Sequence, residues 1–129
     1  MAGNLILVDT SILIDYYRKT VKENSTWISL VRQGYSFAIS SVTKYEIFSG
    51  ASKSQLSFWQ NVLDAIYIIP LDEKCVDMAI SINIGLKKRR KQIDLADLFI
   101  GATALANGLS IATLNKRHFE RIEKLTIVG

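Results

Sequence analysis

Short apolar runs recur along the chain and are separated by longer segments of mixed character. Five runs rich in isoleucine, leucine and valine cover residues 5–8, 37–39, 66–69, 110–113 and 125–128. Runs of this length and composition are typical of parallel strands that are covered on both faces. We therefore predict five buried strands.

Six segments between these runs carry apolar residues three or four positions apart, which is the spacing of one helix face. They cover residues 11–19, 26–33, 42–49, 56–65, 73–86 and 94–106. The last segment is apolar almost all round and ends at Asn107 and Gly108, a helix stop signal. We predict a helix over each segment.

Strands that alternate with helices predict an α/β fold, a sandwich built around a parallel sheet. The length of 129 residues fits one domain, residues 1–129, with a single core. In open parallel sheets, ligand sites form beyond the carboxyl ends of the strands. We therefore expect the catalytic or ligand-binding residues to lie where the predicted strands end.

The composition narrows the class of protein. Hydrophobic residues make up 49% and charged residues 22%, as in globular proteins. No apolar run approaches the roughly 20 residues of a membrane span, and the run at 5–8 is too short for a signal peptide. We expect a cytoplasmic protein. The single cysteine, Cys75, excludes an internal disulfide, and the only histidine, His118, excludes a zinc site of several histidines.

A basic run interrupts this pattern after the fifth predicted helix. The chain carries a net charge of +4, and the run consists of Lys87, Lys88, Arg89, Arg90 and Lys91. Cations are stabilising at a helix C-terminus, so the run fits a solvated helix end. It also fits a surface that contacts the phosphates of a nucleic acid. The sequence leaves both interpretations open.

Two acidic residues follow predicted strands. Asp9 comes directly after the strand at 5–8, where it fits either a helix N-cap or a site at the strand end. Glu46 lies in the helix after the second strand, where it fits either a surface position near the helix start or a site residue. Its neighbours Tyr45, Ile47 and Phe48 favour burial.

Two further acids open the apolar helix at 94–106. Asp94 fits an N-cap, because an acid three positions later resembles a capping arrangement. Asp97 is flanked by Ala96, Leu98 and Phe99, so we expect its carboxylate to be buried. A buried carboxylate must be paired, protonated or bound to a metal. No cation close by in the sequence offers Asp97 a partner.

Several carboxylates at one end of a sheet repel one another unless a cation neutralises them. Oxygen ligands favour Mg²⁺ or Mn²⁺ over zinc, and protein-bound Mg²⁺ usually keeps several waters and meets a phosphate. Such a metal lowers the pKa of a bound water and stabilises a charged transition state. The acids therefore point to phosphodiester hydrolysis.

Four segments together resemble the PIN-domain ribonucleases, in particular the VapC-type toxins. They read LVDTS at residues 7–11, SSVTKYE at 40–46, DLADLFIGATALA at 94–106 and ATLNKRHF at 112–119. The segments span nearly the whole chain in the family's order. The resemblance implies a three-layer α/β/α fold and Mg²⁺- or Mn²⁺-dependent cleavage of RNA.

The resemblance also implies site residues. The positions that match the family's metal ligands are Asp9, Glu46 and Asp97. Asp94 occupies a position where some members carry an acid, and we rank it lower because it also fits a helix cap. Candidate substrate-binding residues are Thr10, Ser11 and Thr113, which lie in the same segments, and Lys87, Lys88 and Arg89 of the basic run.

The resemblance also implies two kinds of assembly. The chain is expected to form a homodimer and to bind a small VapB-like antitoxin that covers the site. We expect the antitoxin to place an arginine or lysine near the acids, because a guanidinium pairs well with carboxylates. Tyr16, Tyr17 and Trp27 fit either an apolar contact with this partner or the ordinary core.

One segment departs from the family pattern. Many members carry a fourth acid in the last segment, where this chain has Asn115 and His118. Asn115 brings no charge, although it can orient a water by hydrogen bonding. His118 fits either a phosphate contact or a partly buried packing residue. The number of metal ions therefore stays open.

Other α/β proteins also place an aspartate after the first strand. A phosphatase with an aspartyl nucleophile usually carries a second aspartate two positions later, where this chain has Ser11. A receiver module would need an acidic pair near the first strand, and that pair is missing. A PIN-like protein that binds RNA without cutting it remains the main alternative.

Overall fold

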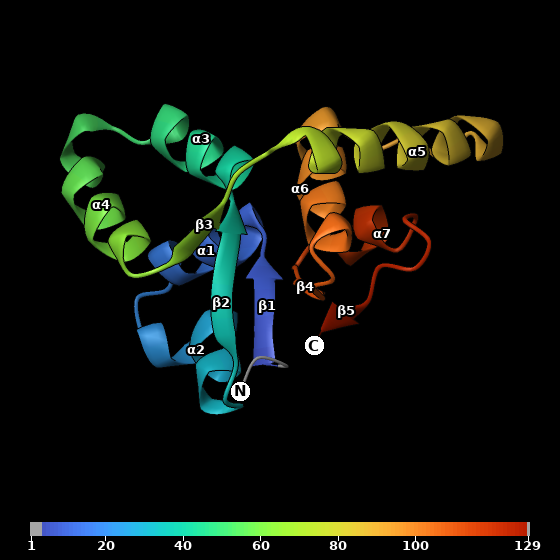
Figure 1. The fold of residues 1–129 in the computed structure, drawn as a ribbon. Helices are drawn as coiled ribbons and strands as arrows, with labels where there is room; N and C mark the ends of the chain where they lie inside the picture. Colours follow the sequence, from blue (N-terminus) through green and yellow to red (C-terminus); the bar gives the residue numbers. More distant parts are fainter. Residues whose placement is uncertain (1–3, 129) are drawn as a thin grey trace.

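A parallel sheet forms the centre of the molecule (Figure 1). The computed structural model describes residues 4–128, and in this range five strands lie in the order β3-β2-β1-β4-β5. The strands are β1 (Leu5–Val8), β2 (Ser36–Ser40), β3 (Tyr67–Ile69), β4 (Ile111–Ala112) and β5 (Ile127–Val128). All five predicted strands are present, and their neighbours run parallel as expected.

Helices connect the strands. They are α1 (Thr10–Arg18), α2 (Thr26–Arg32), α3 (Ser41–Gly50), α4 (Leu56–Asp64), α5 (Glu73–Arg89), α6 (Leu95–Ala106) and α7 (Lys116–Phe119), with short 3₁₀ turns at Lys22–Asn24 and Lys53–Gln55. The six predicted helices are confirmed, and α5 runs three residues further than predicted. The sequence analysis missed α7, because four residues are too few to show helical spacing.

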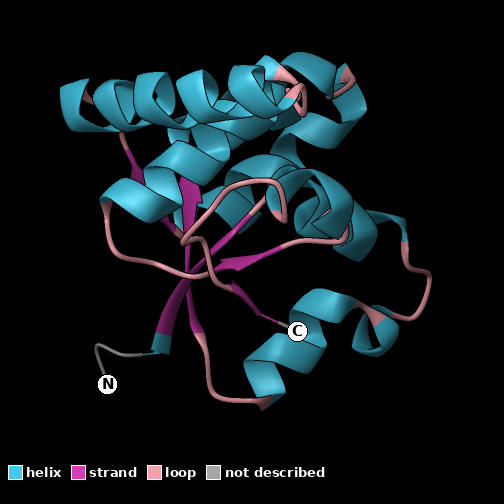
Figure 2. Ribbon diagram, turned by 90° about the vertical axis from the view of Figure 1, so that its right-hand side faces the viewer, coloured by secondary structure: helices cyan, strands magenta, loops and turns pink. Residues whose placement is uncertain are grey.

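The two faces of the sheet carry separate apolar clusters. Ile6 and Val8 of β1 pack against α1 to α4 on one face, whereas Leu7 packs against α6 and the α7 region on the other. Figure 2 shows helices on both sides of the strands. Helix α5 lies outside α6 and contacts it through a third cluster. The three-layer α/β/α sandwich is therefore confirmed.

A glycine allows α6 to approach the segment after α7. A Cβ atom on Gly101 would lie 2.5 Å from Ile122 Cδ1, much closer than real carbon atoms pack. Ile122 is itself buried, at 3% exposure. A larger residue at position 101 would require the Ile122 side chain to move, so Gly101 allows α6 and this segment to pack closely.

The order in which the chain adds strands to the sheet reverses between β1 and β4. From β1 it passes to β2 and β3 on one side, then returns through α5 and α6 to β4 on the other side. The backbone amide of Asp9 donates to the carbonyl of Ala112 at 3.1 Å, so the carboxyl ends of β1 and β4 lie together. Ligands of open α/β sheets bind at such switch points.

Two further features bear on the class of protein. Cys75 is fully buried in α5, where it packs as a small apolar residue. Among the described residues, no helix combines the length and the apolar character needed to cross a membrane.

Candidate metal centre

Asp9 lies at the switch point and serves two roles there. It is the N-cap of α1, and its carboxylate Oδ1 accepts a long hydrogen bond, 3.4 Å, from the amide of Ile12. The same carboxylate is only 3% exposed and faces the ends of β1 and β4. The cap and the site interpretations of Asp9 are therefore compatible, because a residue that follows a strand and opens a helix occupies the switch point itself.

Two hydroxyl groups fix the Asp9 carboxylate. Ser11 Oγ donates to Oδ1 at 2.5 Å, and Thr113 Oγ1 donates to Oδ2 at 2.6 Å. The hydroxyl oxygens in turn accept from the backbone amides of Leu114 at 3.0 Å and Asn115 at 2.8 Å. Ser11 and Thr113 thus join the ends of β1 and β4 through Asp9, and their hydroxyl protons point at the carboxylate.

The surroundings of Asp9 disfavour its negative charge. Burial raises the pKa of Asp9 above its ordinary value, and the hydrogen bonds from Ser11, Thr113 and Ile12 oppose this rise. The negative charge of Asp97 raises the pKa further. A buried carboxylate next to a second one is the electrostatic environment that a divalent cation would relieve.

Glu46 is linked to the turn that carries Asp9. It is half-buried on α3, and its Oε1 accepts a hydrogen bond of 2.6 Å from Thr10 Oγ1. The same hydroxyl lies 3.2 Å from Thr43 Oγ1, which is fully buried. Thr10 directly follows Asp9, so this bond holds the Glu46 carboxylate to the turn that presents Asp9.

Asp97 has a partner that the local sequence did not suggest. His118 Nδ1 on α7 lies 2.7 Å from Asp97 Oδ2, and Asn115 Nδ2 lies 3.5 Å from the same oxygen. The Asp97 side chain is 17% exposed. The two departures from the expected motif, Asn115 and His118, therefore both converge on Asp97.

Asp94 is exposed at the N-cap position of α6, yet its side chain makes no capping hydrogen bond. Only its backbone carbonyl takes part, accepting from the amide of Leu98 at 2.9 Å. The capping interpretation, for which Asp94 was ranked low, was wrong. Within the described residues, Asp94, Asp97 and His118 each offer a ligand atom, and these atoms lie within 4.8 Å of one another.

The predicted site residues thus fall into two connected groups. Asp9, held by Ser11 and Thr113, lies close enough to Asp97 for its pKa to respond, and Asp97 joins Asp94 and His118. Glu46 is tied to the Asp9 turn through Thr10. The carboxylate oxygens of these acids suit Mg²⁺ or Mn²⁺. Of the three predicted ligands, Asp97 belongs to the group whose ligand atoms lie within 4.8 Å, whereas Asp9 and Glu46 lie outside that group.

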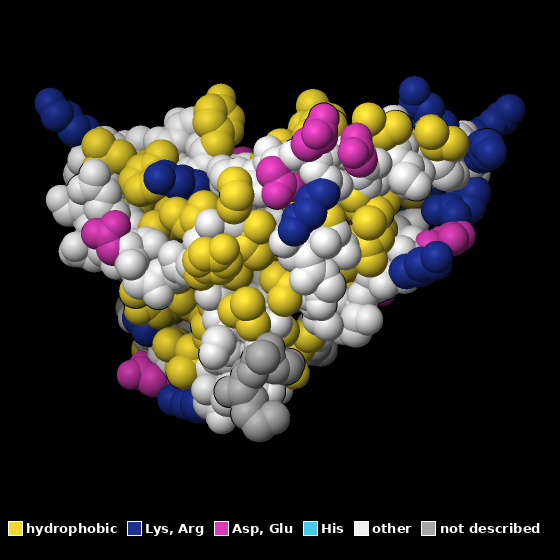
Figure 3. All heavy atoms as spheres, in the orientation of Figure 1, with side chains coloured by type: hydrophobic (Ala, Val, Ile, Leu, Met, Phe, Trp, Pro, Cys, Tyr) yellow, Lys and Arg dark blue, Asp and Glu magenta, His cyan; other side chains and the backbone are white. Residues whose placement is uncertain are grey.

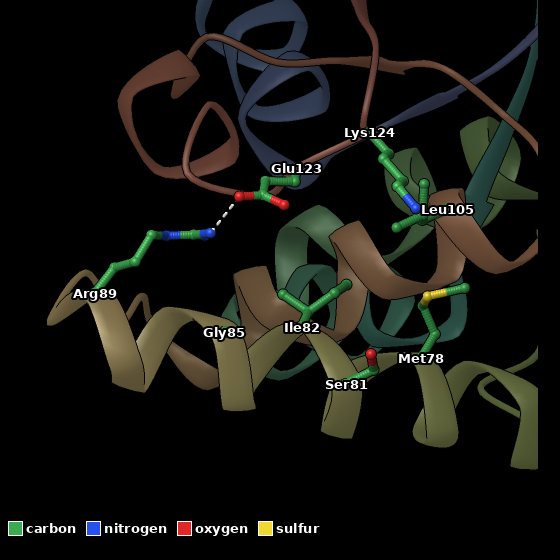
Figure 4. A pocket seen from close by; sticks show the side chains of 8 residues that line it. All are labelled: Met78, Ser81, Ile82, Gly85, Arg89, Leu105, Glu123 and Lys124. Atoms are coloured by element: carbon green, nitrogen blue, oxygen red, sulfur yellow. Dashed lines mark hydrogen bonds and ion pairs between the residues drawn. The ribbon is translucent and has the colours of Figure 1, made fainter.

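The residues of the basic run lie at the end of α5. Lys87 and Lys88 are exposed in its last turn. Arg89 is engaged elsewhere: its guanidinium pairs with Glu123 and donates from Nη2 to the carbonyl of Arg121 at 2.9 Å. Figure 4 shows this pair at the rim of a cavity of about 350 Å³ that none of the candidate acids lines.

Known proteins resemble this chain over most of its length. Ribonuclease VapC1 of Methanocaldococcus jannaschii is 36% identical over 120 residues, which cover 92% of this chain and 82% of the relative. Ribonuclease VapC10 of Mycobacterium tuberculosis is 30% identical over 121 residues, covering 94% and 90%.

Solved structures share the fold. The DNA-bound VapBC of Salmonella typhimurium superposes with a TM-score of 0.84 at 22% identity, covering 95% of this chain and 96% of that one. A toxin–antitoxin complex from Klebsiella pneumoniae gives a TM-score of 0.77 at 26% identity and covers 96% of each chain.

The sequence model of the PIN domain matches residues 6–125, a range that includes most of β1, all of β4 and the candidate acids. With this match and the 36% identity to a relative that is covered to 82%, the chain belongs to the PIN-domain family.

Proposed function

We propose that this chain is a divalent-metal-dependent endoribonuclease and the toxin of a toxin–antitoxin pair. One observation carries the proposal: the buried carboxylate of Asp9 is fixed at the switch point beside Asp97, and its pKa is raised. Such an arrangement is unfavourable without a cation and favourable with one. The names of the relatives, which are ribonucleases, supply the substrate class.

In this proposal some residues bind the metal, and others orient the carboxylates that bind it. Asp9, Asp97 and Glu46 would hold Mg²⁺ or Mn²⁺, with Asp94 and His118 beside them. Ser11 and Thr113 keep the Asp9 carboxylate in one orientation, and Thr10 does the same for Glu46. His118 and Asn115 orient Asp97.

The bound metal would activate a water and neutralise charge on the phosphodiester. The protein's part is to hold the acids in fixed positions, because hydrogen-bonded ligands lose little entropy when the cation arrives. Ser11 occupies the position where an aspartyl phosphatase needs its second acid, and its hydroxyl is bound to Asp9. This supports hydrolysis by water over a phosphoenzyme mechanism.

A cleavage assay tests the activity. RNA should be cut in Mg²⁺ or Mn²⁺ and left intact in EDTA. Asp97→Asn should abolish cleavage while the protein stays folded, and Asp77→Asn, which alters an exposed acid on α5, should not. Binding of RNA without cleavage in any divalent metal would favour the alternative of a catalytically silent RNA-binding module.

Two hollows beside α1 support the antitoxin as a partner. One is lined in part by Tyr17, Glu46 and Trp59, the other by Ser11 and Leu114. Both open next to site residues, so a segment lying along α1 would cover the acids. Of the three aromatic candidates, Tyr17 lines a hollow, and its ring also packs against Phe58 and Trp59 of the core. Tyr16 stacks on Phe58 and meets Trp27 edge to face, which favours the core interpretation for that pair.

The antitoxin is expected to bring an arginine or lysine to the acids. Asp9→Asn and Glu46→Gln should therefore weaken antitoxin binding at low salt more than Asp77→Asn does. Equal affinities would leave steric cover as the mode of inhibition and exclude the basic side chain.

We also propose a homodimer. Val76, Ile80 and Ile84 lie four residues apart on α5, and each is exposed. An exposed apolar stripe of this kind is typical of a protein interface. Light scattering on the purified chain should give twice the mass of 14.5 kDa, and Ile80→Asp should give the monomer.

A further inference from the structure

A groove between the end of α5 and α7 gathers positive charge. We call it the basic groove; its lining residues are Arg90, Lys91, Arg117, Glu120 and Arg121. Its volume is about 450 Å³, within the range of small-ligand sites. Figure 3 shows Lys and Arg side chains gathered at the edge of the molecule where α5 ends in Figure 1. Four cations against one carboxylate make the groove a receptor for anions.

An unusual backbone conformation presents one of these cations. Arg90 follows the last turn of α5 in the left-handed region, at φ 55° and ψ 43°. Glycine is the residue usually found at such a position, because side chains are disfavoured there. The helix would end there equally well with glycine, so helix termination does not explain an arginine.

Hydrogen bonds hold the two walls of the groove together. Arg121 Nη1 donates to the carbonyl of Gln92 at 2.9 Å, which joins the segment after α7 to the loop before α6. Arg89 pairs with Glu123 and also donates to the carbonyl of Arg121. Arg89 thus lies outside the groove and holds the segment that carries Arg121 in place. Within residues 4–128, Arg90, Lys91 and Arg117 take part in no ion pair.

Short stretches of chain join both walls to the candidate metal centre. Arg117 directly precedes His118, whose ring contacts Asp97. Lys91 lies three residues before Asp94. A strand whose reacting phosphate lies at Asp97 can therefore reach the groove.

We propose that the basic groove binds backbone phosphates of the RNA strand on one side of the bond that is cut. This inference rests on the proposed ribonuclease function. No aromatic side chain lines the groove among the described residues, so base stacking contributes nothing there. Arginine and lysine bind phosphate without reading sequence. The groove therefore supplies affinity that is independent of sequence. Of the basic run, Arg90 and Lys91 line the groove, whereas Lys87, Lys88 and Arg89 do not.

Charge-removing variants separate this role from a structural one. Arg90→Gly should fold as well as the native chain or melt at a higher temperature, since glycine suits the left-handed position. Arg117→Gln alters an exposed residue of α7, and Glu120→Gln removes the one acid of the groove. Arg32→Gln is the matched control. It removes the same charge at the end of α2, shortly before β2 begins and thus at the opposite end of the sheet.

Binding is measured in EDTA, by fluorescence anisotropy of a labelled single-stranded oligoribonucleotide of mixed sequence. Each of Arg90→Gly and Arg117→Gln should raise Kd about three- to tenfold at low salt and reduce the log–log salt slope by about 0.7, the value for one lost phosphate contact on a single strand. Glu120→Gln should lower Kd. Changes no larger than those of Arg32→Gln would overturn the proposal.

Cleavage in Mg²⁺ provides the second measurement. The groove variants should raise KM and leave kcat close to native, because they bind the strand away from the reacting phosphate. If the native chain cuts RNA and the variants match it in KM, the groove proposal fails and the ribonuclease function stands. If the native chain neither binds nor cuts RNA, the proposed function itself fails.

Discussion

His118 Nδ1 lies 2.7 Å from Asp97 Oδ2, although 21 residues separate the two in sequence. The contact joins α7 to the first turn of α6 and fixes the position of the Asp97 carboxylate. Groups that hold a metal-binding carboxylate in place affect metal affinity strongly, even when they are not ligands themselves.

We therefore predict that His118→Ala weakens Mn²⁺ binding roughly 10- to 100-fold, the usual effect of removing such a partner. Titration calorimetry with the metal alone measures this without RNA. Lys116→Ala, on the same short helix but exposed, should bind Mn²⁺ like the native chain. Native affinity in His118→Ala would show that the histidine only packs against Asp97.

The raised pKa of Asp9 has a consequence for stability without metal. Because burial raises the pKa, the folded chain holds this proton more tightly than the unfolded chain. The stabilisation is complete below the unfolded pKa, near 3.8, and is lost as the pH rises through the folded pKa. The free energy of unfolding in EDTA should therefore fall over this window.

Asp9→Asn is the matched variant for this effect. It keeps the side-chain shape but cannot ionise, so the gap between variant and native stability should widen in favour of the variant as the pH rises. Urea unfolding across a pH series in EDTA measures the gap. Parallel pH profiles for the two proteins would contradict the assignment to Asp9.

Much of the fold follows from local pattern. The five apolar runs and six amphipathic segments lie where the strands and the longer helices form, because each buries its apolar residues against the sheet or a neighbouring helix. The position of Asp9 at a strand end follows as well, whereas the pairing of β1 with β4, which makes that end a switch point, is known from the structure alone. Short elements such as α7 are not predicted from the sequence pattern, because tertiary contacts rather than helical spacing define them.

The acidic residues of the candidate site could be predicted from the sequence, but their side-chain contacts could not. Asp9 and Asp97 stand out because they interrupt apolar surroundings. The partnership of Asp97 with His118, and that of Arg89 with Glu123 34 residues away, depend on how α5, α6 and α7 pack. Asp94 shows the opposite error: its position at the start of a helix predicted a cap, but its carboxylate lies with Asp97 and His118 instead.

Gly101 provides a test of the packing that positions α7. Alanine in a helix interior normally gains about 1 kcal/mol over glycine, but overpacking in a core costs about 1–3 kcal/mol. Since a Cβ would lie 2.5 Å from Ile122 Cδ1, we predict that Gly101→Ala lowers the free energy of unfolding by about 1 kcal/mol.

Ile122→Val removes the methyl group that the new Cβ would meet. In this background Gly101→Ala should be neutral or stabilising, which gives a coupling of about 1 kcal/mol in a double-mutant cycle. Additive effects of the two substitutions would show that Gly101 is required for another reason.

Thr113 links both strand ends to the metal centre, and its hydroxyl performs two functions. It donates to Asp9 Oδ2 at 2.6 Å and accepts from the amide of Asn115 at 2.8 Å. Thr113→Val preserves the shape but leaves a buried carboxylate oxygen and an amide without this partner. We predict a loss of about 1–3 kcal/mol in the free energy of unfolding.

The same substitution should alter metal binding in a way that a packing defect would not. The Thr113 bond lowers the pKa of Asp9, so its removal raises that pKa. Because the ligand must be deprotonated, the pH at which Mn²⁺ binding is half-maximal should move upward. Thr113→Ser, which keeps the hydroxyl, should restore the native value. Thr103→Val is the control, since that buried hydroxyl donates to the Phe99 carbonyl within α6 and takes no part in the hydrogen bonds that act on Asp9. An equal shift in both valine variants would refute the role of Thr113 in setting the charge of Asp9.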